Sequence, residues 1–406
     1  MSQEPQSFKS RLKESIKHNP IYTKAIRPLR VKLNTLIEST LDDEAYFVRR
    51  HKKIFGYTPD FRNPKTFNEK IIHRILFDRS PVYTALADKL KARIYIAATL
   101  YPLYENAIRD GAECNASLDS SLDSSAQPTI QALAKLNLLE PSSTLFAPID
   151  SLRSTLLATN ICPYLPKLYG IYKSFDEIDF ASLPTSFAIK TNHDCGGVVL
   201  VPDKQEFLRD QARFQAAKSK IQQHLATNFY TLFREWHYKD IEPRVFIEEL
   251  LGASSPANTA PSTESSTDSR AKTFENDDFH NKIAQNPESY KAPTDYKCHI
   301  FNGALSHIDT IIDKFTNQTE IAMTPTWEKM PFDYDKKASH IPKKPKNLAL
   351  MQELAISLAD KFSYVRVDLY EIDEQIIVGE LTFTPTGGTD RFSPMQWDRN
   401  LGDLWV

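Results

Sequence analysis

The sequence predicts an α+β protein whose sheets are built from antiparallel hairpins. Apolar residues alternate along Tyr364–Tyr370 and again along Ile376–Thr382, and Asp373-Glu374 between them is suited to a turn. Just upstream, residues 348–362 carry apolar side chains at helical spacing. Strands and helices do not follow one another in the regular order of a βαβ series, so a mixed rather than a doubly wound fold is expected.

The remaining elements follow from the same periodicities. Residues 206–226 show helical spacing, and Thr66-x-x-Glu69 is a capping box that predicts a helix running through Leu76. Short strands are expected at Phe187–Lys190, Val198–Val201, Arg244–Leu251, Tyr296–Phe301 and Leu305–Ile312.

Composition excludes several classes of function. The 406 residues have a net charge of -2, so no overall field favours nucleic acid or an anionic membrane. No apolar run approaches the roughly 20 residues that span a bilayer, and the polar N-terminus lacks the apolar stretch of a secretory signal. We therefore expect a cytoplasmic protein without a transmembrane segment.

The four cysteines lie far apart, without a C-x-x-C pair. This spacing argues against a zinc knuckle or a disulfide framework and suits a reducing compartment. Cys195 stands beside His193 and Asp194, but sequence neighbours rarely form a catalytic constellation, so a thiol enzyme is disfavoured.

Composition along the chain suggests five regions. Two of them, 105–160 and 253–293, contain Ser-rich tracts that bury too little apolar surface to offset chain entropy, and flexible surface insertions are expected there. The regions are a helical N-terminal part at 1–104, the insertion 105–160, a central lobe at 161–252, the insertion 253–293 and a C-terminal lobe with a metal site at 294–406.

Residues 7–45 alternate basic and apolar positions, broken by Pro20 and Pro28 into short amphipathic helices. One interpretation is peripheral contact with an anionic membrane surface. The other, which we favour, is a helical cap on the core.

The hairpin at the C-terminal end carries the strongest chemical signal. If Asp373-Glu374 closes it, Asp368 and Glu380 lie close together across the strand pair, and Arg366 and Thr382 share their faces. Two carboxylates and a hydroxyl beside a cation suit a hard divalent metal such as magnesium. A surface strand pair with cross-strand charges is an equal alternative from these residues alone.

Three further segments are weaker signals singly. Lys190 ends an apolar strand and precedes a loop with Gly196-Gly197, an arrangement that can bring an ammonium and backbone N–H groups to phosphate oxygens. The apolar strand that ends in Glu248-Glu249 can offer main chain and carboxylate to a nucleoside, and Lys297 adds a cation on another strand. Each is also compatible with an ordinary turn or a solvated strand end.

In their order along the chain, a set of short segments resembles the TupA-like branch of the ATP-grasp superfamily. The likeness covers the chain from about residue 45 to its end, apart from the two insertions. Its segments are Asn63–Ile71, Leu86–Lys89, Leu165–Gly170, Phe187–Gly197, Arg234–Trp236, Asp295–Lys297, Phe301–Gly303, Phe315–Asn317, Val365–Tyr370 and Gly379–Pro385. The resemblance implies an ATP-grasp fold, in which two α+β lobes clasp ATP.

The resemblance also implies roles for individual residues. Lys190 and Lys297 correspond to phosphate-contacting lysines, and Arg366 to the arginine that stabilises the transferring phosphoryl group. The loop with Asn192, His193, Gly196 and Gly197 corresponds to the one that covers the triphosphate, and Glu248, Glu249 and Leu250 to the adenine and ribose site. Asp368 and Glu380 correspond to the magnesium carboxylates. Thr382 departs from the usual asparagine there, although its hydroxyl can ligate weakly or through water.

The implied reaction is ATP-dependent joining of a carboxylate and an amine through an acylphosphate, in the synthesis of a capsule or other surface polysaccharide. Lys65, Lys70 and Lys89 either help to bind an anionic acceptor or are solvated. A glycosyltransferase of a surface-polysaccharide pathway is one alternative, although no D-x-D-like motif occurs. A degenerate ATP-grasp binding module is the other, and the presence of all five charged site residues argues against it.

Overall fold

The computed structural model describes residue 33 and residues 36–109, 125–252, 292–313 and 318–406. The chain divides into two compact units, of which the larger comprises 60–264 and 283–406. The smaller comprises 1–59 and 265–282. Most of the predicted amphipathic segment 7–45, and nearly all of the insertion 253–293, lie outside the described residues.

In the smaller unit, helix α3 (Asp43–Phe55) has well-defined ends. The Asp42 side chain accepts a hydrogen bond of 2.7 Å from the Ala45 N–H, and Gly56 ends the helix with a φ of 83°. A carboxylate at the N-terminus and a left-handed glycine at the C-terminus are the usual solutions for unpaired helix ends.

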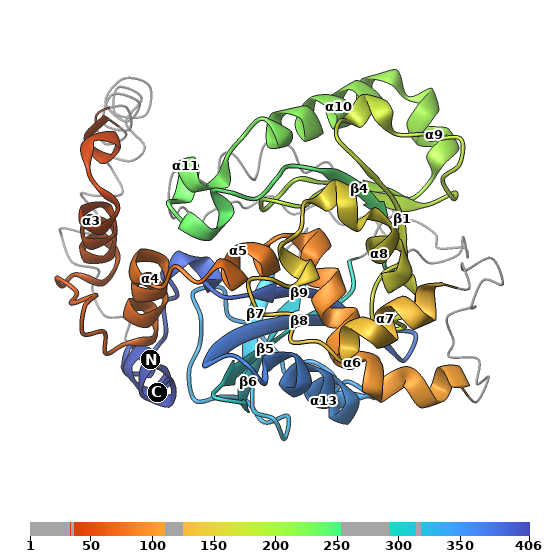
Figure 1. The fold of residues 1–406 in the computed structure, drawn as a ribbon. Helices are drawn as coiled ribbons and strands as arrows, with labels where there is room; N and C mark the ends of the chain where they lie inside the picture. Colours follow the sequence, from red (N-terminus) through yellow and green to blue (C-terminus); the bar gives the residue numbers. More distant parts are fainter. Residues whose placement is uncertain (1–32, 34–35, 110–124, 253–291, 314–317) are drawn as a thin grey trace, which may run out of the picture. The chain divides into compact units, whose positions relative to one another are not determined.

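The larger unit contains both sheets and most of the described helices (Figure 1). Its described α-helices are α4 (Phe67–Phe77), α5 (Pro81–Ala87), α6 (Lys89–Arg109), α7 (Ala126–Ala134), α8 (Arg153–Ala158), α9 (Lys204–Arg209), α10 (Gln211–Leu225), α11 (Phe229–Phe233), α13 (Leu348–Ala359) and α14 (Gln396–Leu404). Short 3-10 turns are η2 (Thr144–Phe146), η3 (Ile149–Leu152), η4 (Thr159–Ile161), η5 (Phe175–Glu177), η6 (Trp236–Tyr238) and η7 (Pro385–Gly387).

Both sheets are antiparallel, as the hairpin pattern predicts. The four-stranded sheet has the order β1-β4-β2-β3, and its strands are β1 (Leu168–Tyr172), β2 (Phe187–Thr191), β3 (Val198–Val201) and β4 (Val245–Glu248). The five-stranded sheet has the order β7-β6-β5-β8-β9. Its strands are β5 (Asp295–Phe301), β6 (Ala304–Ile312), β7 (Thr319–Met323), β8 (Tyr364–Ile372) and β9 (Gln375–Thr382). The predicted α+β class is confirmed.

The predicted elements differ from the observed ones in two places. The helix expected over 206–226 is broken at Asp210, whose carboxylate accepts a hydrogen bond of 3.0 Å from the Arg213 N–H and so caps α10. The strand expected to run from Arg244 to Leu251 ends at Glu248. Capping side chains and the end of strand pairing, rather than periodicity, decide these boundaries.

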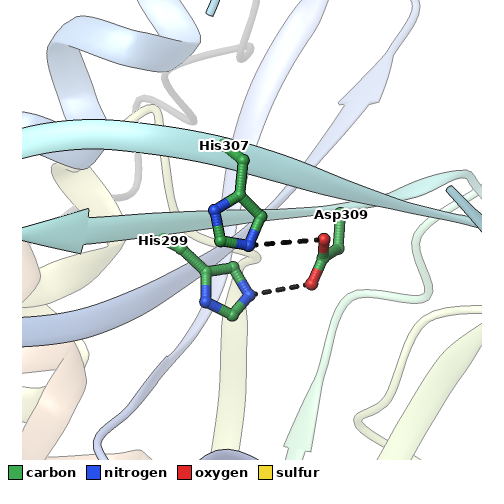
Figure 2. A group of neighbouring side chains, drawn as sticks. All are labelled: His299, His307 and Asp309. Carbon is green, nitrogen blue, oxygen red and sulfur yellow. Dashed lines mark ion pairs between the residues drawn. The ribbon is translucent and has the colours of Figure 1, made fainter. Parts of the chain in front are cut away.

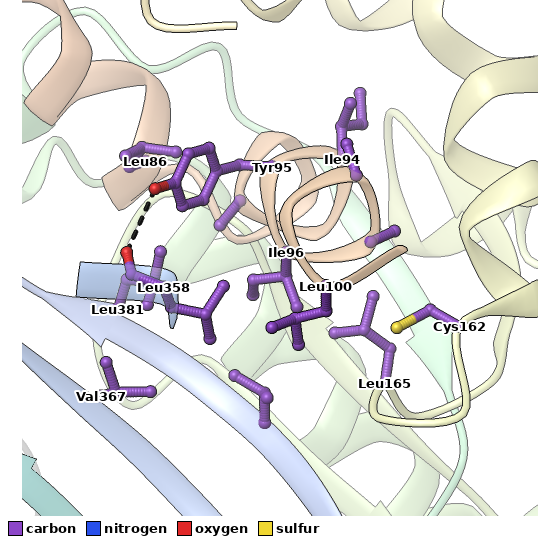
Figure 3. Close-up of a cluster of buried hydrophobic side chains, with 14 of the residues drawn as sticks. Leu86, Ile94, Tyr95, Ile96, Leu100, Cys162, Leu165, Leu358, Val367 and Leu381 are labelled. Carbon is purple, nitrogen blue, oxygen red and sulfur yellow. Dashed lines mark hydrogen bonds between the residues drawn. The ribbon is translucent and has the colours of Figure 1, made fainter. Parts of the chain in front are cut away.

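One face of the five-stranded sheet is apolar and carries the main core. Val367 of β8 and Leu381 of β9 pack in one cluster with residues of α5, α6 and α13 (Figure 3). Within it the Tyr95 hydroxyl donates a hydrogen bond of 3.1 Å to the Leu358 carbonyl. Because side chains alternate along a strand, the opposite face of the same sheet is left for polar residues.

The region 105–160 is folded more than its composition predicts. Residues 110–124 lie outside the described part, but α7 and α8 follow them. Ile130, Leu145 and Leu156 of this region are fully buried in the main core. The Ser-rich tract is short, and the apolar residues after it are numerous enough to pack.

The capping box at α4 is confirmed. The Thr66 hydroxyl accepts a hydrogen bond of 3.2 Å from the Glu69 N–H, and the Glu69 carboxylate accepts one of 3.1 Å from the Thr66 N–H. We expect Thr66→Ala to lower the free energy of unfolding by about 1 kcal/mol. Urea unfolding tests this, with the exposed Thr231→Ala expected to stay within about 0.5 kcal/mol of wild type. Equal effects of the two substitutions would contradict a capping role.

Candidate active site

The β8–β9 hairpin places the predicted carboxylates opposite each other. Asp368 pairs with Glu380 and Arg366 with Thr382 in the strand register. Asp373 and Glu374 close the hairpin with φ values of 49° and 68°, the left-handed geometry of a tight two-residue turn. The register then shifts at Gly379, so a β-bulge adjoins the two carboxylates.

Asp368 accepts hydrogen bonds from two cations. The Arg366 Nε lies 2.7 Å from Oδ1, and the Arg366 Nη2 lies 2.8 Å from Oδ2. The Lys297 ammonium lies 2.5 Å from the same Oδ2 and 3.0 Å from the Asp295 carboxylate. A bidentate guanidinium and an ammonium on one buried carboxylate form a tight charged cluster.

Glu380 belongs to the same cluster but is half exposed. Its Oε1 lies 3.4 Å from Arg366 Nη2 and accepts a hydrogen bond of 2.9 Å from the Thr382 hydroxyl. Partial loss of water around this carboxyl raises its pKa, but the charges of Arg366, Lys297 and Lys89 oppose this more strongly and lower the pKa to about 2. Glu380 is therefore ionised at neutral pH.

The donor set fits a magnesium ion. Asp368 and Glu380 offer carboxylate oxygens from adjacent strands, Thr382 adds a hydroxyl, and Glu380 is both ionised and reachable from solvent. Two cations already at Asp368 show that this face attracts positive charge. Lys297 and Arg366 would have to turn toward phosphate oxygens for the carboxylate to take a metal.

A second charged cluster lies on the four-stranded sheet. Lys190 of β2 forms an ion pair with Glu248 of β4, and Arg93 of α6 lies 3.4 Å from the other Glu248 oxygen. The apolar Ile189 and Ile247 point to the opposite face, against α9 and α10. Alternation along the strands thus gathers Lys190 and Glu248 on one polar face.

The loop after β2 is held by buried polar residues. The Asn192 side-chain amide donates a hydrogen bond of 2.9 Å to Asp88 Oδ1, and its oxygen accepts one of 2.7 Å from the Arg244 N–H. A β-carbon on Gly197 would lie 1.8 Å from the Thr191 hydroxyl, so only glycine fits there. Gly196 adopts a φ of 89°.

Lys89 connects this loop with the β9 carboxylate. Its ammonium donates a hydrogen bond to the Asp194 main-chain carbonyl, and its charge contributes to the lowered pKa of Glu380. Asp194 in turn is bonded to His224 and Thr191. Lys89 of α6 therefore contacts the loop after β2 and also acts electrostatically on the charged cluster of the five-stranded sheet.

A family model described as TupA-like ATPgrasp matches residues 160–258 and 267–406. These two ranges hold both sheets, the cluster on the β8–β9 hairpin and the Lys190–Glu248 ion pair. The chain belongs to the TupA-like ATP-grasp family. The predicted resemblance and the predicted ATP-grasp fold are confirmed.

Several solved ligases are similar to this TupA-like chain at low identity. A D-alanine–D-alanine ligase from Bacillus anthracis complexed with ATP is 15% identical, over 58% of this chain and 61% of that one, with a TM-score of 0.26. An L-amino acid ligase from Bacillus licheniformis is 12% identical, over 59% and 43%, with a TM-score of 0.30. D-cycloserine synthetase DcsG is 12% identical, over 70% and 80%, with a TM-score of 0.28. This chain thus spans less than two thirds of the first two ligases, and no curated protein matches it.

The other predicted nucleotide contacts of the TupA-like chain lie just after β4 and in the loop after β2. The Glu249 carboxylate accepts a hydrogen bond of 3.1 Å from the Lys167 N–H, and Leu250 is buried. His193 is also buried, with its Nε2 3.1 Å from the His224 carbonyl. Their assignment to adenine, ribose and triphosphate stays a prediction.

Sequence reasoning missed a buried cluster on the polar face of the five-stranded sheet. His299 of β5 and His307 and Asp309 of β6 lie together (Figure 2). In the strand register His299 pairs with Arg366, and Asp309 pairs with Lys297. Burial lowers the pKa of His307 to about 3 and that of His299 well below its usual value, so both rings are neutral. Asp295, Lys297 and His299 stand at every second position of one strand, and this spacing could have indicated that they share a face.

Two further carboxyl groups lie within electrostatic reach of Asp309. Burial, together with the charges of Asp309 and Asp390, raises the pKa of Glu320 to about 8. Burial and the Asp309 charge also raise the pKa of Asp390 to about 7. This end of the sheet face is therefore rich in acidic groups.

Among the helices that the structure describes, none combines the length and apolar character that a bilayer crossing requires.

Proposed function

We propose that this protein is an ATP-dependent carboxylate–amine ligase that works through an acylphosphate. The observation that carries the proposal is the cluster in which Arg366 joins Asp368 to Glu380 while Lys297 contacts Asp368. It lies on the polar face of a sheet in a chain that belongs to an ATP-grasp family. Both cations and both carboxylates that such chemistry requires are gathered within hydrogen-bonding distance.

The proposed reaction has two steps. An oxygen of the substrate carboxylate attacks the γ-phosphorus of ATP, the bond to the β-phosphate oxygen breaks, and ADP leaves. The nitrogen of an amine then attacks the acyl carbon, phosphate leaves with the bonding electrons, and the amine loses a proton. Arg366 and Lys297 offer donors to the negative charge that develops on the transferring phosphoryl oxygens.

Magnesium would be held by Asp368 and Glu380, with Thr382 beside them, and when bound it neutralises phosphate charge. Lys190 would offer a second ammonium to phosphate oxygens, positioned by its ion pair with Glu248. The glycine pair at 196–197 would let the backbone approach the triphosphate. A closed site that excludes water protects the acylphosphate from hydrolysis.

The substrate class follows from the family alone. The TupA-like branch is associated with surface polysaccharides, so the proposed substrates are a uronic-acid or amino-acid carboxylate and an amine, one of them attached to a surface polysaccharide. On this proposal the reaction would belong to the synthesis of a capsule or a related cell-envelope polymer, on the cytoplasmic side. Peripheral membrane contact through residues 7–45 remains a separate proposal.

Calorimetry with ATP, with and without magnesium, tests the proposal directly. We expect magnesium-dependent binding to wild type and at least about tenfold weaker binding to Asp368→Ala, because one metal carboxylate is removed. Asp360→Ala is a matched control, since Asp360 is an exposed carboxylate paired with Lys361. ATP binding would justify screening acids and amines for ADP release.

Two outcomes would overturn the proposal. Binding of a UDP-sugar without binding of ATP would favour a glycosyltransferase. Binding of ATP without ADP release across a broad acid and amine screen would favour a binding module that has lost catalysis.

A further inference from the structure

His299, His307 and Asp309 form a compact group of nitrogen and oxygen donors. Their ligand atoms all lie within 4.8 Å of one another. His299 Nε2 lies 2.9 Å from Asp309 Oδ2, and His307 Nε2 lies 3.7 Å from Asp309 Oδ1. Figure 2 shows both rings turned toward the same carboxylate. Around a tetrahedral zinc ion with bonds near 2.1 Å, neighbouring ligand atoms lie about 3.4 Å apart.

The strand register holds this group in place. His299 and His307 are direct cross-strand partners on β5 and β6, and Asp309 follows on the same face two residues later. The two imidazole rings stack, with centroids 4.3 Å apart and an angle of 17° between their planes. The donors belong to central strands of the sheet, which fix their backbone positions. Because stacked rings direct their lone pairs in parallel, one ring has to turn about its side-chain bonds for both Nε2 atoms to reach one ion.

The group is buried and its polar atoms are incompletely satisfied. His299, His307 and Asp309 are 2%, 0% and 3% exposed. His307 Nε2 and Asp309 Oδ1 have no hydrogen-bond partner, and the contact of His299 Nε2 with Asp309 Oδ2 lacks hydrogen-bond geometry. Buried polar groups are normally hydrogen-bonded, so three such atoms that face one another call for an explanation.

The other ring nitrogens do have partners. His299 Nδ1 lies 3.0 Å from the Tyr364 hydroxyl, and His307 Nδ1 lies 3.1 Å from the Ser306 hydroxyl. The Tyr334 hydroxyl donates a hydrogen bond of 3.0 Å to Asp309 Oδ2. When Nδ1 of each ring carries the proton, both Nε2 lone pairs are available, and such outer partners are typical around metal-binding histidines.

We propose that His299, His307 and Asp309 bind a divalent transition-metal ion, with zinc as the best fit, at a site separate from the magnesium carboxylates. Two imidazoles and one carboxylate form a donor set that suits zinc, whereas magnesium prefers oxygen ligands alone. Three protein ligands leave a further coordination position open. The site adjoins the ligase cluster, because His299 pairs with Arg366 and Asp309 with Lys297 in the register.

Metal titration of tag-free protein tests the site without any nucleotide. After removal of metals with a chelator, wild type should bind about one equivalent of Co²⁺ with the visible absorption of a tetrahedral complex, and Zn²⁺ should displace it. His307→Ala should weaken binding by at least about 100-fold, and Ser306→Ala by about tenfold, because it removes an outer partner. The exposed His340→Ala should bind as wild type does. Added Zn²⁺ should also raise the melting temperature of wild type but not of His307→Ala.

Further variants separate this site from the ligase proposal and from misfolding. Asp368→Asn should still bind one Zn²⁺, so loss of nucleotide binding and loss of zinc binding are independent results. Asp309→Asn keeps the side-chain volume, and circular dichroism verifies that each variant is folded. Failure of wild type to bind more Zn²⁺ or Co²⁺ than folded His307→Ala would overturn the proposal, as would equal displacement of Co²⁺ by Mg²⁺.

Discussion

Arg366→Met should reduce ADP release by at least about 1,000-fold under conditions where the wild type turns over ATP. The guanidinium contacts both Asp368 and Glu380. On the proposed function it would lie where charge develops on the transferring phosphoryl group. Burial lowers the pKa of Arg366, but Asp368 and Glu380 more than compensate and raise it well above its usual value. The Arg366 side chain therefore stays positively charged, and an ion from solvent cannot take over its role.

Arg366→Lys separates charge from geometry. It retains a cation but cannot make two parallel hydrogen bonds to Asp368, so an intermediate loss of about 100-fold is expected. Steady-state ADP release with the acid and amine found by screening measures both variants. Arg399→Gln is the control, because Arg399 lies in an exposed i,i+4 pair with Asp403 and should change turnover less than twofold. A folded Arg366→Met protein with near-normal turnover would exclude Arg366 from the chemistry.

Glu248→Gln should lower the free energy of unfolding by about 3–5 kcal/mol. The Glu248 side chain is 7% exposed and faces two cations, Lys190 and the 4%-exposed Arg93. Removal of its charge leaves Arg93 buried beside a neutral amide, with the Pro166 carbonyl at 2.6 Å as a remaining partner. A buried, uncompensated cation is costly, whereas Lys190 can turn to solvent.

Urea unfolding at neutral pH measures this loss. Glu242→Gln is a matched control, because Glu242 pairs with Arg244 but is 48% exposed, and a loss below about 1 kcal/mol is expected. The double variant Arg93→Met with Glu248→Leu should recover much of the stability, since it removes both buried charges. If Glu248→Gln and Glu242→Gln behave alike, the Glu248 ion pairs contribute little to the fold.

The C-terminal hairpin was predictable because its information is local. Alternating apolar residues, a two-residue turn and period-two geometry place Asp368 opposite Glu380 without reference to the rest of the chain. The capping box at Thr66 and Glu69 was predictable for the same reason. Each signal is complete within about 20 residues.

The partners of the site residues were not predictable in this way. Arg93 on α6 reaches Glu248 on β4 across 155 positions of sequence, and Lys89 reaches the Asp194 carbonyl across 105. Neither segment contains a pattern that marks the other. Residues 125–160 were also expected to be flexible, although Ile130, Leu145 and Leu156 fill the main core.

The sequence by itself determined the α+β class, most strands and helices, and the TupA-like ATP-grasp family with its ordered charged residues. Only the tertiary structure decided which charges meet: Lys297 with both Asp295 and Asp368, Lys190 with Glu248, and the two histidines with Asp309. The physical reason is that strand and helix periodicity depends on neighbours in sequence, whereas ion pairing depends on strand order and register. Those are settled when the whole sheet packs against its core.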